Sequence, residues 1–253
     1  MNDYRHRITA YNAINDENVF GSFKRDDNFT SILEHVSYEQ GIQYINEIKK
    51  YNWKQLNWNL FLGNDIIGNP QTYNYFNELN EITLNTFYIS PSTLRYICFG
   101  LQLLSYIKYC NKTELSIIEV GGGYGGQCKI LFDLCKSNGI TISKYTIVDL
   151  TEITLLQSKY LTKLNYENVE TIPFDGCEKI IDNHYDLFIS NYALSEFMPD
   201  IQTFYINNVL PKCSNYFITW NALPIHTYFK NSKIVEESPQ TNPTQFKNVI
   251  ITN

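Results

Sequence analysis

The sequence predicts an α/β protein whose largely parallel sheet follows a helical N-terminal region. From residue 115 onward, short apolar segments alternate with helix-compatible segments, which is the pattern of βαβ units. The first of these apolar segments, residues 115–120, breaks into a glycine cluster at its end. The last two, residues 233–236 and 248–252, have no helix between them and therefore favour an antiparallel hairpin that closes the sheet.

The N-terminal region shows helical spacing and no strand alternation. Apolar residues recur at helical spacing within residues 30–51, and a second, mostly apolar helix is expected over residues 91–110, with Ser90 or Ser92 as its N-cap. Between them, residues 63–70 are rich in turn-forming residues and favour a loop. We therefore expect a helical cap or substrate region at 1–85 and a catalytic domain at 86–253.

The remaining elements of the catalytic domain follow the same alternation. After the glycine cluster we expect strands at 145–149, 169–173, 185–190 and 216–220. The helices between them are expected at 127–138, 153–164 and 198–209. An open sheet of this kind binds its ligand at the carboxyl ends of the strands, at the point where the strand order reverses.

Composition excludes several classes of function. Hydrophobic residues make up 43% of the 253 residues, enough for a buried core, and the net charge of −6 argues against a general nucleic-acid binder. The six cysteines are scattered and form no C-x-x-C pair, which favours reduced thiols in the cytoplasm. The N-terminus lacks the apolar core of a signal peptide, and no apolar run approaches the roughly 18 residues of a membrane span.

The glycine cluster at residues 117–126, IIEVGGGYGG, is typical of a cofactor loop between a strand and a helix. Glycines allow sharp turns and a close approach of ligand to backbone, and the following helix offers free N–H groups. The spacing fits two patterns at once. Gly121, Gly123 and Gly126 satisfy the G-x-G-x-x-G dinucleotide pattern. Glu119, Gly121, Gly123 and Gly125 satisfy the E-x-G-x-G-x-G pattern of methyltransferases that use S-adenosylmethionine (SAM).

Acidic residues at three strand ends are candidate cofactor contacts. Asp149 ends the second strand, where a carboxylate accepts hydrogen bonds from both hydroxyls of a ribose; a helix cap is the alternative. Glu119 lies inside a buried strand, where a carboxylate needs a partner, and we expect it near the amino-acid end of the cofactor. Asp175 follows the third strand, where it either meets the adenine amino group or forms a surface turn.

Residues after the fourth and fifth strands are candidates for catalysis. Ser190, Asn191 and Tyr192 lie at the rim where a transfer reaction would occur, and Glu196 is either a general base or a carboxylate favoured at a helix N-terminus. His226, just past the fifth strand, is the other candidate base, with surface decoration as the alternative. Asp182, His184 and Asp186 alternate along a strand start and would form a poor metal cage, so we expect no metal site.

With these segments together, the chain resembles the sugar O-methyltransferases of the SAM-dependent class I superfamily. The matching stretches are IGNP at 67–70, SPSTLRY at 90–96, EVGGGYGGQCKIL at 119–131, IVDLTEITLLQSKYL at 147–161 and SNYALSEF at 190–197. The resemblance implies a seven-stranded, Rossmann-like methyltransferase sheet with a terminal antiparallel hairpin. It further implies that Glu119, Gly121, Gly123 and Asp149 contact SAM, and that the helix carrying Thr93 and Arg95 closes over it. Gly122, Tyr124, Gly125, Leu150 and Ser190 complete the expected cofactor site.

The function expected from these features is methyl transfer from SAM to a sugar hydroxyl, on a nucleotide sugar or a growing glycan. His226 or Glu196 would remove the proton, while Asn191 and Tyr192 orient the acceptor. An NAD-dependent oxidoreductase shares the glycine loop, but its loop usually opens near the N-terminus. A non-catalytic subunit of a glycan-assembly complex is the third hypothesis. The partner is a small molecule, and the oligomeric state, a homodimer included, stays open.

Overall fold

The computed structural model describes residues 5–79, 87–241 and 246–253. Its centre is a seven-stranded sheet with the strand order β5-β4-β3-β6-β7-β9-β8, in which β3 to β7 run parallel and the β9–β8 end is antiparallel. The predicted fold class, a Rossmann-like sheet with a terminal antiparallel hairpin, is therefore confirmed. The strands of this sheet are β3 (Glu114–Val120), β4 (Thr141–Asp149), β5 (Val169–Pro173), β6 (Tyr185–Asn191), β7 (Cys213–Trp220), β8 (Lys233–Glu236) and β9 (Val249–Thr252).

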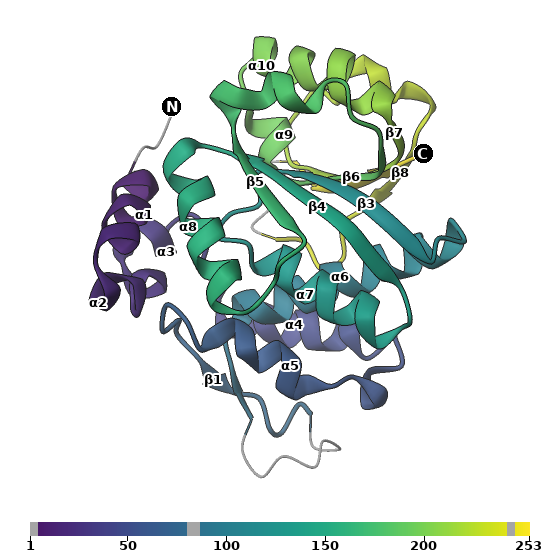
Figure 1. Cartoon of the computed structure of the whole chain (residues 1–253). Coiled ribbons are helices and arrows are strands. Elements are labelled where there is room, and N and C mark those ends of the chain that lie inside the picture. The colour runs from purple at the N-terminus through teal and green to yellow at the C-terminus, as the bar shows by residue number, and fades with distance from the viewer. Residues whose placement is uncertain (1–4, 80–86, 242–245) are drawn as a thin grey trace.

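Helices cover both faces of the sheet (Figure 1). One face carries α6, α7 and α8, and the other carries α9 and α10. The short helices α1, α2 and α3 lie beside α8, and α4 and α5 lie outside α6 and α7. The helices are α1 (Arg5–Asn15), α2 (Glu17–Phe20), α3 (Asp27–Thr30), α4 (Tyr38–Ile48), α5 (Trp58–Leu62), α6 (Pro91–Tyr109), α7 (Gly126–Ser137), α8 (Thr151–Lys163), α9 (Ala193–Glu196) and α10 (Pro199–Phe204).

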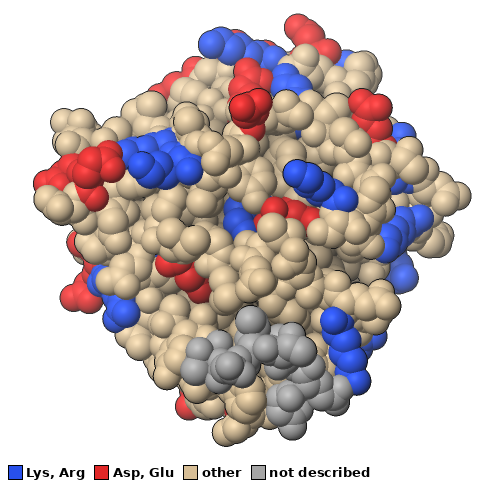
Figure 2. All heavy atoms as spheres, turned by 60° about the horizontal axis from the view of Figure 1, so that its bottom comes forward, with Lys and Arg blue, Asp and Glu red and all other residues tan. Residues whose placement is uncertain are grey.

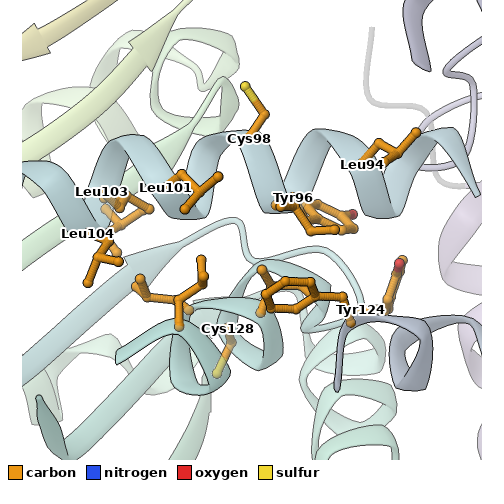
Figure 3. Packing of buried hydrophobic residues seen from close by; sticks show 14 of the residues in the cluster. Leu94, Tyr96, Cys98, Leu101, Leu103, Leu104, Tyr124 and Cys128 are labelled. Carbon is orange, nitrogen blue, oxygen red and sulfur yellow. The ribbon is translucent and has the colours of Figure 1, made fainter. Parts of the chain in front are cut away.

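The sheet has one hydrophobic cluster on each face. The larger cluster joins the N-terminal helices, α6, α7 and α8 to residues of β3 and β4, and the smaller one packs α9, α10 and the following turn against β6 and β7. In Figure 3, Tyr96, Leu101 and Leu104 of α6 point toward α7, which carries Cys128. Because α6 is apolar nearly all round, its first half is buried between the sheet layer and the N-terminal helices.

Three expectations for the elements need correction. The helical segment expected at 30–51 is helical only as α4, because α3 ends at Thr30, residues 31–37 form a turn, and Ser37 and Gln40 form a capping box that starts α4 at Tyr38. The helix expected at 198–209 ends as α10 at Phe204 and continues as a π-helical turn, Tyr205–Val209. The N-terminal region also contributes β1 (Tyr73–Asn74), which pairs antiparallel with β2 (Tyr88–Ile89).

The other expected elements lie within a few residues of their observed bounds. Strands β5 and β8 begin and end where the sequence pattern places them. Helix α6 is capped by Ser90, whose hydroxyl accepts the N–H of Thr93 at 3.1 Å, while Pro91 occupies the first turn. The division at residue 85 into a cap and a catalytic domain stays a prediction.

Candidate functional site

The strand order reverses between β3 and β6, and the glycine loop lies at the carboxyl end of β3 beside this switch point. Gly121, Gly123 and Gly125 have φ values of +75°, +57° and +96°, a region that side-chain-bearing residues rarely adopt. A Cβ atom on Gly121 would lie 2.1 Å from the Cβ of Ala193 in α9. The loop is therefore glycine-rich for two reasons. Its backbone adopts left-handed φ values, and it packs closely against α9, the helix that follows β6.

Asp149, at the end of β4, faces this loop. Its carboxylate accepts hydrogen bonds from the N–H of Leu150 at 2.8 Å and from Nε2 of Gln157 at 2.9 Å, and also from the backbone N–H groups of Gly122 and Gly123. Burial nevertheless raises the pKa of Asp149 to about 7, because these donors only partly offset the loss of water. The carboxyl group of Asp149 is thus held at the loop with a pKa close to neutral pH.

Gln157 was not singled out in the sequence. It lies in α8, is fully buried, and also donates to the carbonyl oxygen of Gly123 at 2.6 Å. Its Oε1 atom is buried without a hydrogen-bond partner among the described residues. The Gln157 side chain therefore links Asp149, the candidate ribose-binding acid, to the glycine loop. The only sequence signal was its place two turns after Asp149, on the helix face that returns to the strand end.

Glu119 lies beneath the loop and is 1% exposed. The hydroxyl of Tyr145 donates to its Oε2 at 2.9 Å, and this oxygen is 3.1 Å from the position of a Cβ on Gly122. Burial raises the pKa of Glu119 to about 7, the Tyr145 hydrogen bond lowers it in part, and the charge of Asp149 adds to the rise. The partner that the sequence required for this buried acid is thus a tyrosine of the neighbouring strand.

A buried polar network supports the loop from the N-terminal side. Nδ2 of Asn64 donates to Oγ1 of Thr93 at 2.7 Å and to the hydroxyl of Tyr124 at 2.9 Å, and Thr93 in turn donates to Oδ1 of Asp65 at 2.6 Å. The ammonium of Lys24, itself fully buried, donates to the carbonyl of Asn64 at 2.6 Å and lies 4.0 Å from the centre of the Tyr124 ring. Thr93 and Tyr124 are fully buried, and their hydroxyls serve this network.

Arg95 lies two residues after Thr93 on α6 and is 6% exposed. Its Nη2 donates to the carbonyl of Leu33 at 3.1 Å. The Leu33 side chain lies over the glycine loop, since its Cδ2 is 3.1 Å from the position of a Cβ on Gly123. The segment between α3 and α4 is therefore the part of the N-terminal region that covers the loop.

The end of β6 is tied to both neighbouring strands. The hydroxyl of Ser190 donates to the carbonyl of Val120 at 3.1 Å and accepts the N–H of Leu194 at 3.0 Å, so it links β3 to the start of α9. Oδ1 of Asn191 accepts the hydroxyl of Thr219 in β7 at 3.0 Å. Among the described residues the Nδ2 of Asn191 has no hydrogen bond, which leaves a donor at the rim.

Tyr192 adopts φ +69°, an unusual conformation for a residue with a side chain. Its hydroxyl donates to Glu237, and its ring meets Phe99 of α6 edge-on with centroids 6.2 Å apart. Glu237 is 3% exposed and also accepts hydrogen bonds from Thr241 and Asn248. This carboxylate, absent from the sequence-based site, fixes the strained tyrosine.

The two candidate bases occupy exposed or half-buried positions after β6 and β7. Glu196 is exposed, and its Oε1 accepts Nδ2 of Asn221 at 2.7 Å; Asn221 also accepts the hydroxyl of Ser195 at 2.5 Å. His226 caps the turn Thr227–Asn231, with its Nδ1 accepting the N–H of Tyr228 at 3.2 Å. In the neutral ring Nε2 then carries the N–H, so the lone pair of His226 that could accept a proton is the one on Nδ1, which already accepts this hydrogen bond.

The adenine-side candidates lie on the same edge of the sheet. Asp149 pairs in register with Pro173, and Asp175 follows two residues later in a short 3-10 turn, Phe174–Ile180, where it is exposed. Leu150 is 37% exposed beside Asp149. The structure thus brings the ends of β3, β4, β5 and β6 to one edge, as the fold requires.

The residues weighed for a metal site lie elsewhere. Asp186 is near the start of β6, at the edge opposite the glycine loop, where it accepts hydrogen bonds from Ser116 and Lys112. Within residues 5–79, 87–241 and 246–253, no three His, Cys, Asp or Glu side chains come close enough to hold a metal ion. None of the helices described there is long and apolar enough to cross a membrane. Figure 2 shows acidic and basic side chains interspersed over one face, without a broad patch of either sign.

Comparisons with known proteins give partial structural matches. No family model matches the sequence, and no curated protein matches it. Among solved structures, PigF with SAH matches at 12% identity and a TM-score of 0.41, over 62% of this chain and 63%, less than two thirds, of that one. Magnesium protoporphyrin IX methyltransferase from Synechocystis, with bound SAH, matches at 13% identity and 0.42, over 63% and 85%. M. capricolum TrmK in complex with SAH matches at 16% identity and 0.43, over 59% and 66%. Function is inferred below from the site itself.

Proposed function

We propose that this protein is a SAM-dependent O-methyltransferase that methylates a hydroxyl of a sugar, carried on a nucleotide sugar or a glycan. The proposal rests on the position of Asp149. Its carboxylate is held against a glycine loop with left-handed φ values, at the switch point of the sheet. A carboxylate there accepts the two ribose hydroxyls of a nucleoside cofactor. The acid-first spacing, Glu119 before the glycines, favours SAM over NAD.

The residues at this edge fit three parts of SAM, namely its ribose, its adenine and its amino-acid end. Asp149 and the adjacent Leu150 would take the ribose, with Asp175 on the adenine side. Gly121, Gly122 and Gly123 have no side chains, so a ligand can approach their backbone closely. Glu119 lies beneath the loop and would act on the amino-acid end through the loop amides. Bound here, SAM supplies an electrophilic methyl group on a sulfonium.

The protein's part in the transfer is alignment and removal of one proton. Asn191 offers a free amide donor at the rim, and the ring of Tyr192, fixed through Glu237, offers a flat surface beside it. Such groups position a sugar hydroxyl for in-line attack. Glu196, held by Asn221, or His226, through Nδ1 after it releases the N–H of Tyr228, would then accept the hydroxyl proton.

The test of the proposal is cofactor binding to the full-length protein. We expect saturable calorimetric binding of SAM and S-adenosylhomocysteine, SAH, and no response to NAD. Asp149→Ala should weaken SAH binding at least tenfold, because the ribose loses its acceptor, while Asp200→Asn, an exposed acid on α10, should not change it. Binding of NAD alone, or full SAH affinity in Asp149→Ala, would refute the proposal.

The acceptor and the base are tested by turnover. Nucleotide sugars and free sugars are screened as acceptors by formation of SAH from SAM. We expect Glu196→Gln or His226→Ala to lower kcat by at least 100-fold with SAH affinity intact, since only the base is lost. Full activity in both variants would remove the base assignment, and SAH binding without turnover on any acceptor would favour the non-catalytic subunit.

A further inference from the structure

Arg95 is a buried cation for which the described ion pairs provide no carboxylate. Its side chain is 6% exposed, and none of the ion pairs among residues 5–79, 87–241 and 246–253 includes it. By contrast, Lys129 of α7, which is also buried, forms an ion pair with Asp133 at 2.6 Å. Charges removed from water are costly unless they are paired, so an unpaired guanidinium at a site edge points to an anionic ligand.

The groups around Arg95 are polar but carry little negative charge. One nitrogen donates to the carbonyl of Leu33, and the guanidinium also donates to the hydroxyl of Tyr96, with its carbon 5.3 Å from the centre of that ring. Tyr44 of α4 and Tyr192 after β6 are its further electrostatic neighbours. A guanidinium has five N–H donors in a fork that matches carboxylate and phosphate oxygens, so these contacts leave donors to spare.

The acids near Arg95 are poor counter-ions. Burial raises the pKa of Glu34, which disfavours its carboxylate form. Glu237, which accepts the Tyr192 hydroxyl, has its oxygens engaged by Thr241 and Asn248 as well. His35, beside Arg95, has a pKa lowered to about 4 by burial and by the Arg95 charge, and its Nδ1 is buried without a hydrogen-bond partner among the described residues. Among the described residues, no carboxylate oxygen lies within ion-pair distance of the Arg95 guanidinium.

We propose that Arg95 is the anion-binding residue of the acceptor site, and that it takes a phosphate or carboxylate group of the substrate. This inference rests on the proposed function. The acceptor is favoured over the cofactor's own carboxylate because Arg95 neighbours Tyr192, at the end of β6. Asp149 is held instead by Gln157 and by backbone N–H groups of the loop, and Glu119 by the hydroxyl of Tyr145. The substrate class is thus an anionic sugar, such as a sugar phosphate or nucleotide sugar.

The experiment measures anion binding to the full-length protein with pyrophosphate as probe. Calorimetry is carried out at constant ionic strength, with and without saturating SAH. We expect saturable pyrophosphate binding that SAH leaves unchanged, a loss of at least tenfold in Arg95→Lys because the fork is gone, and no change in Arg25→Gln, an exposed arginine of the N-terminal region. Circular dichroism confirms that each variant is folded.

Each other outcome overturns the assignment. Absence of saturable pyrophosphate binding to the wild type removes the site. Unchanged binding in folded Arg95→Lys and Arg95→Gln places the anion elsewhere. Competition between SAH and pyrophosphate would show that Arg95 binds the carboxylate of the cofactor instead of an acceptor group. The two proposals fail separately: pyrophosphate binding that depends on Arg95 in a protein that does not bind SAH would retain the anion site and refute the methyltransferase.

Discussion

Two acids beneath and beside the glycine loop set the pH response of the ligand-free protein. Glu119 and Asp149 each have a pKa of about 7, raised by burial. A carboxyl group that holds its proton more tightly when folded than when unfolded stabilises the fold most at low pH. Stability then falls as pH rises from the unfolded pKa, near 4, through the folded pKa, near 7.

Replacing Glu119 with Gln should therefore stabilise the ligand-free protein at pH 8. The amide keeps the shape of the protonated acid and its contact with Tyr145 but cannot ionise. A pKa rise from 4.5 to about 7 corresponds to roughly 3 kcal/mol, so we expect a gain of about 1–3 kcal/mol at pH 8 and less than about 1 kcal/mol at pH 5. Urea unfolding at both pH values measures it. Glu114→Gln, at the exposed start of the same strand, is the control, and an equal effect in both variants would contradict the assignment.

Asp149 should make cofactor binding depend on pH in the opposite sense. Its ionised form accepts hydrogen bonds from ribose hydroxyls better than its protonated form, so SAH affinity should rise through pH 7. We expect about tenfold weaker binding at pH 5.5 than at pH 8. Calorimetry across this range on wild type and Asp149→Asn tests it. The asparagine variant should bind weakly at every pH, and a wild-type profile that is flat would exclude Asp149 from the ribose.

The sequence could reveal the site residues that belong to a local pattern. Asp149 and the glycines belong to one unit of strand, loop, helix and strand, β3 to β4, so spacing alone identifies them. Tyr145, Gln157 and Glu237 act across separate elements, and no spacing links Glu237 to Tyr192, which is 45 residues away. Their roles follow from tertiary packing, which only the structure supplies.

At the scale of elements, the glycine loop combines a strained backbone with tight packing, and two glycines separate these effects. Gly121 and Gly139 have similar φ values, +75° and +69°, yet a Cβ on Gly121 would lie 2.1 Å from Ala193 while one on Gly139 would meet nothing within 4 Å. Alanine at either position should cost about 1–2 kcal/mol of backbone strain. Gly121→Ala should cost at least about 2 kcal/mol more, because α9 must move.

Urea unfolding of the two alanine variants measures this difference. Gly121→Ala should in addition weaken SAH binding, because displacement of α9 opens the switch point, whereas Gly139→Ala at the distal end of α7 should leave SAH binding unchanged. Equal destabilisation of the two variants would show that the β3–α9 contact is loose and would remove packing as a reason for Gly121.

The elements themselves were predictable where pattern and local chemistry agree. The strands of the sheet and helices α6 to α8 have their periodicity in one stretch of chain, and the Ser90 cap of α6 and Gly139 after α7 mark two of the helix ends. Over residues 30–51 the apolar spacing continued past a helix end, because Leu33 and its neighbours face the glycine loop from a turn. The N-cap signal of Ser37 with Gln40 was present in the sequence and competed with that periodicity.

For the whole molecule, the N-terminal region and the sheet share one hydrophobic cluster. Phe23 and Phe29 pack against Tyr124 of the glycine loop, with ring centroids 5.8 and 6.2 Å apart, and Arg7 of α1 pairs with Glu152 of α8 at 2.8 Å. A glycine loop that packs against residues of the N-terminal region cannot keep its shape when that region unfolds. We therefore expect the two regions to unfold together, in a single transition.

Phe29→Ala tests this coupling. The side chain is fully buried, so its removal should cost about 3–5 kcal/mol, and because the cluster is continuous the whole transition should shift. Far-UV circular dichroism and near-UV aromatic signals should remain coincident during urea unfolding. Ile8→Ala, at a position that is 59% exposed on α1, should change stability by about 0.5 kcal/mol or less. An early transition confined to part of the far-UV signal would mean that the N-terminal region is an independent cap, and the cofactor loop would then owe its shape to the sheet alone.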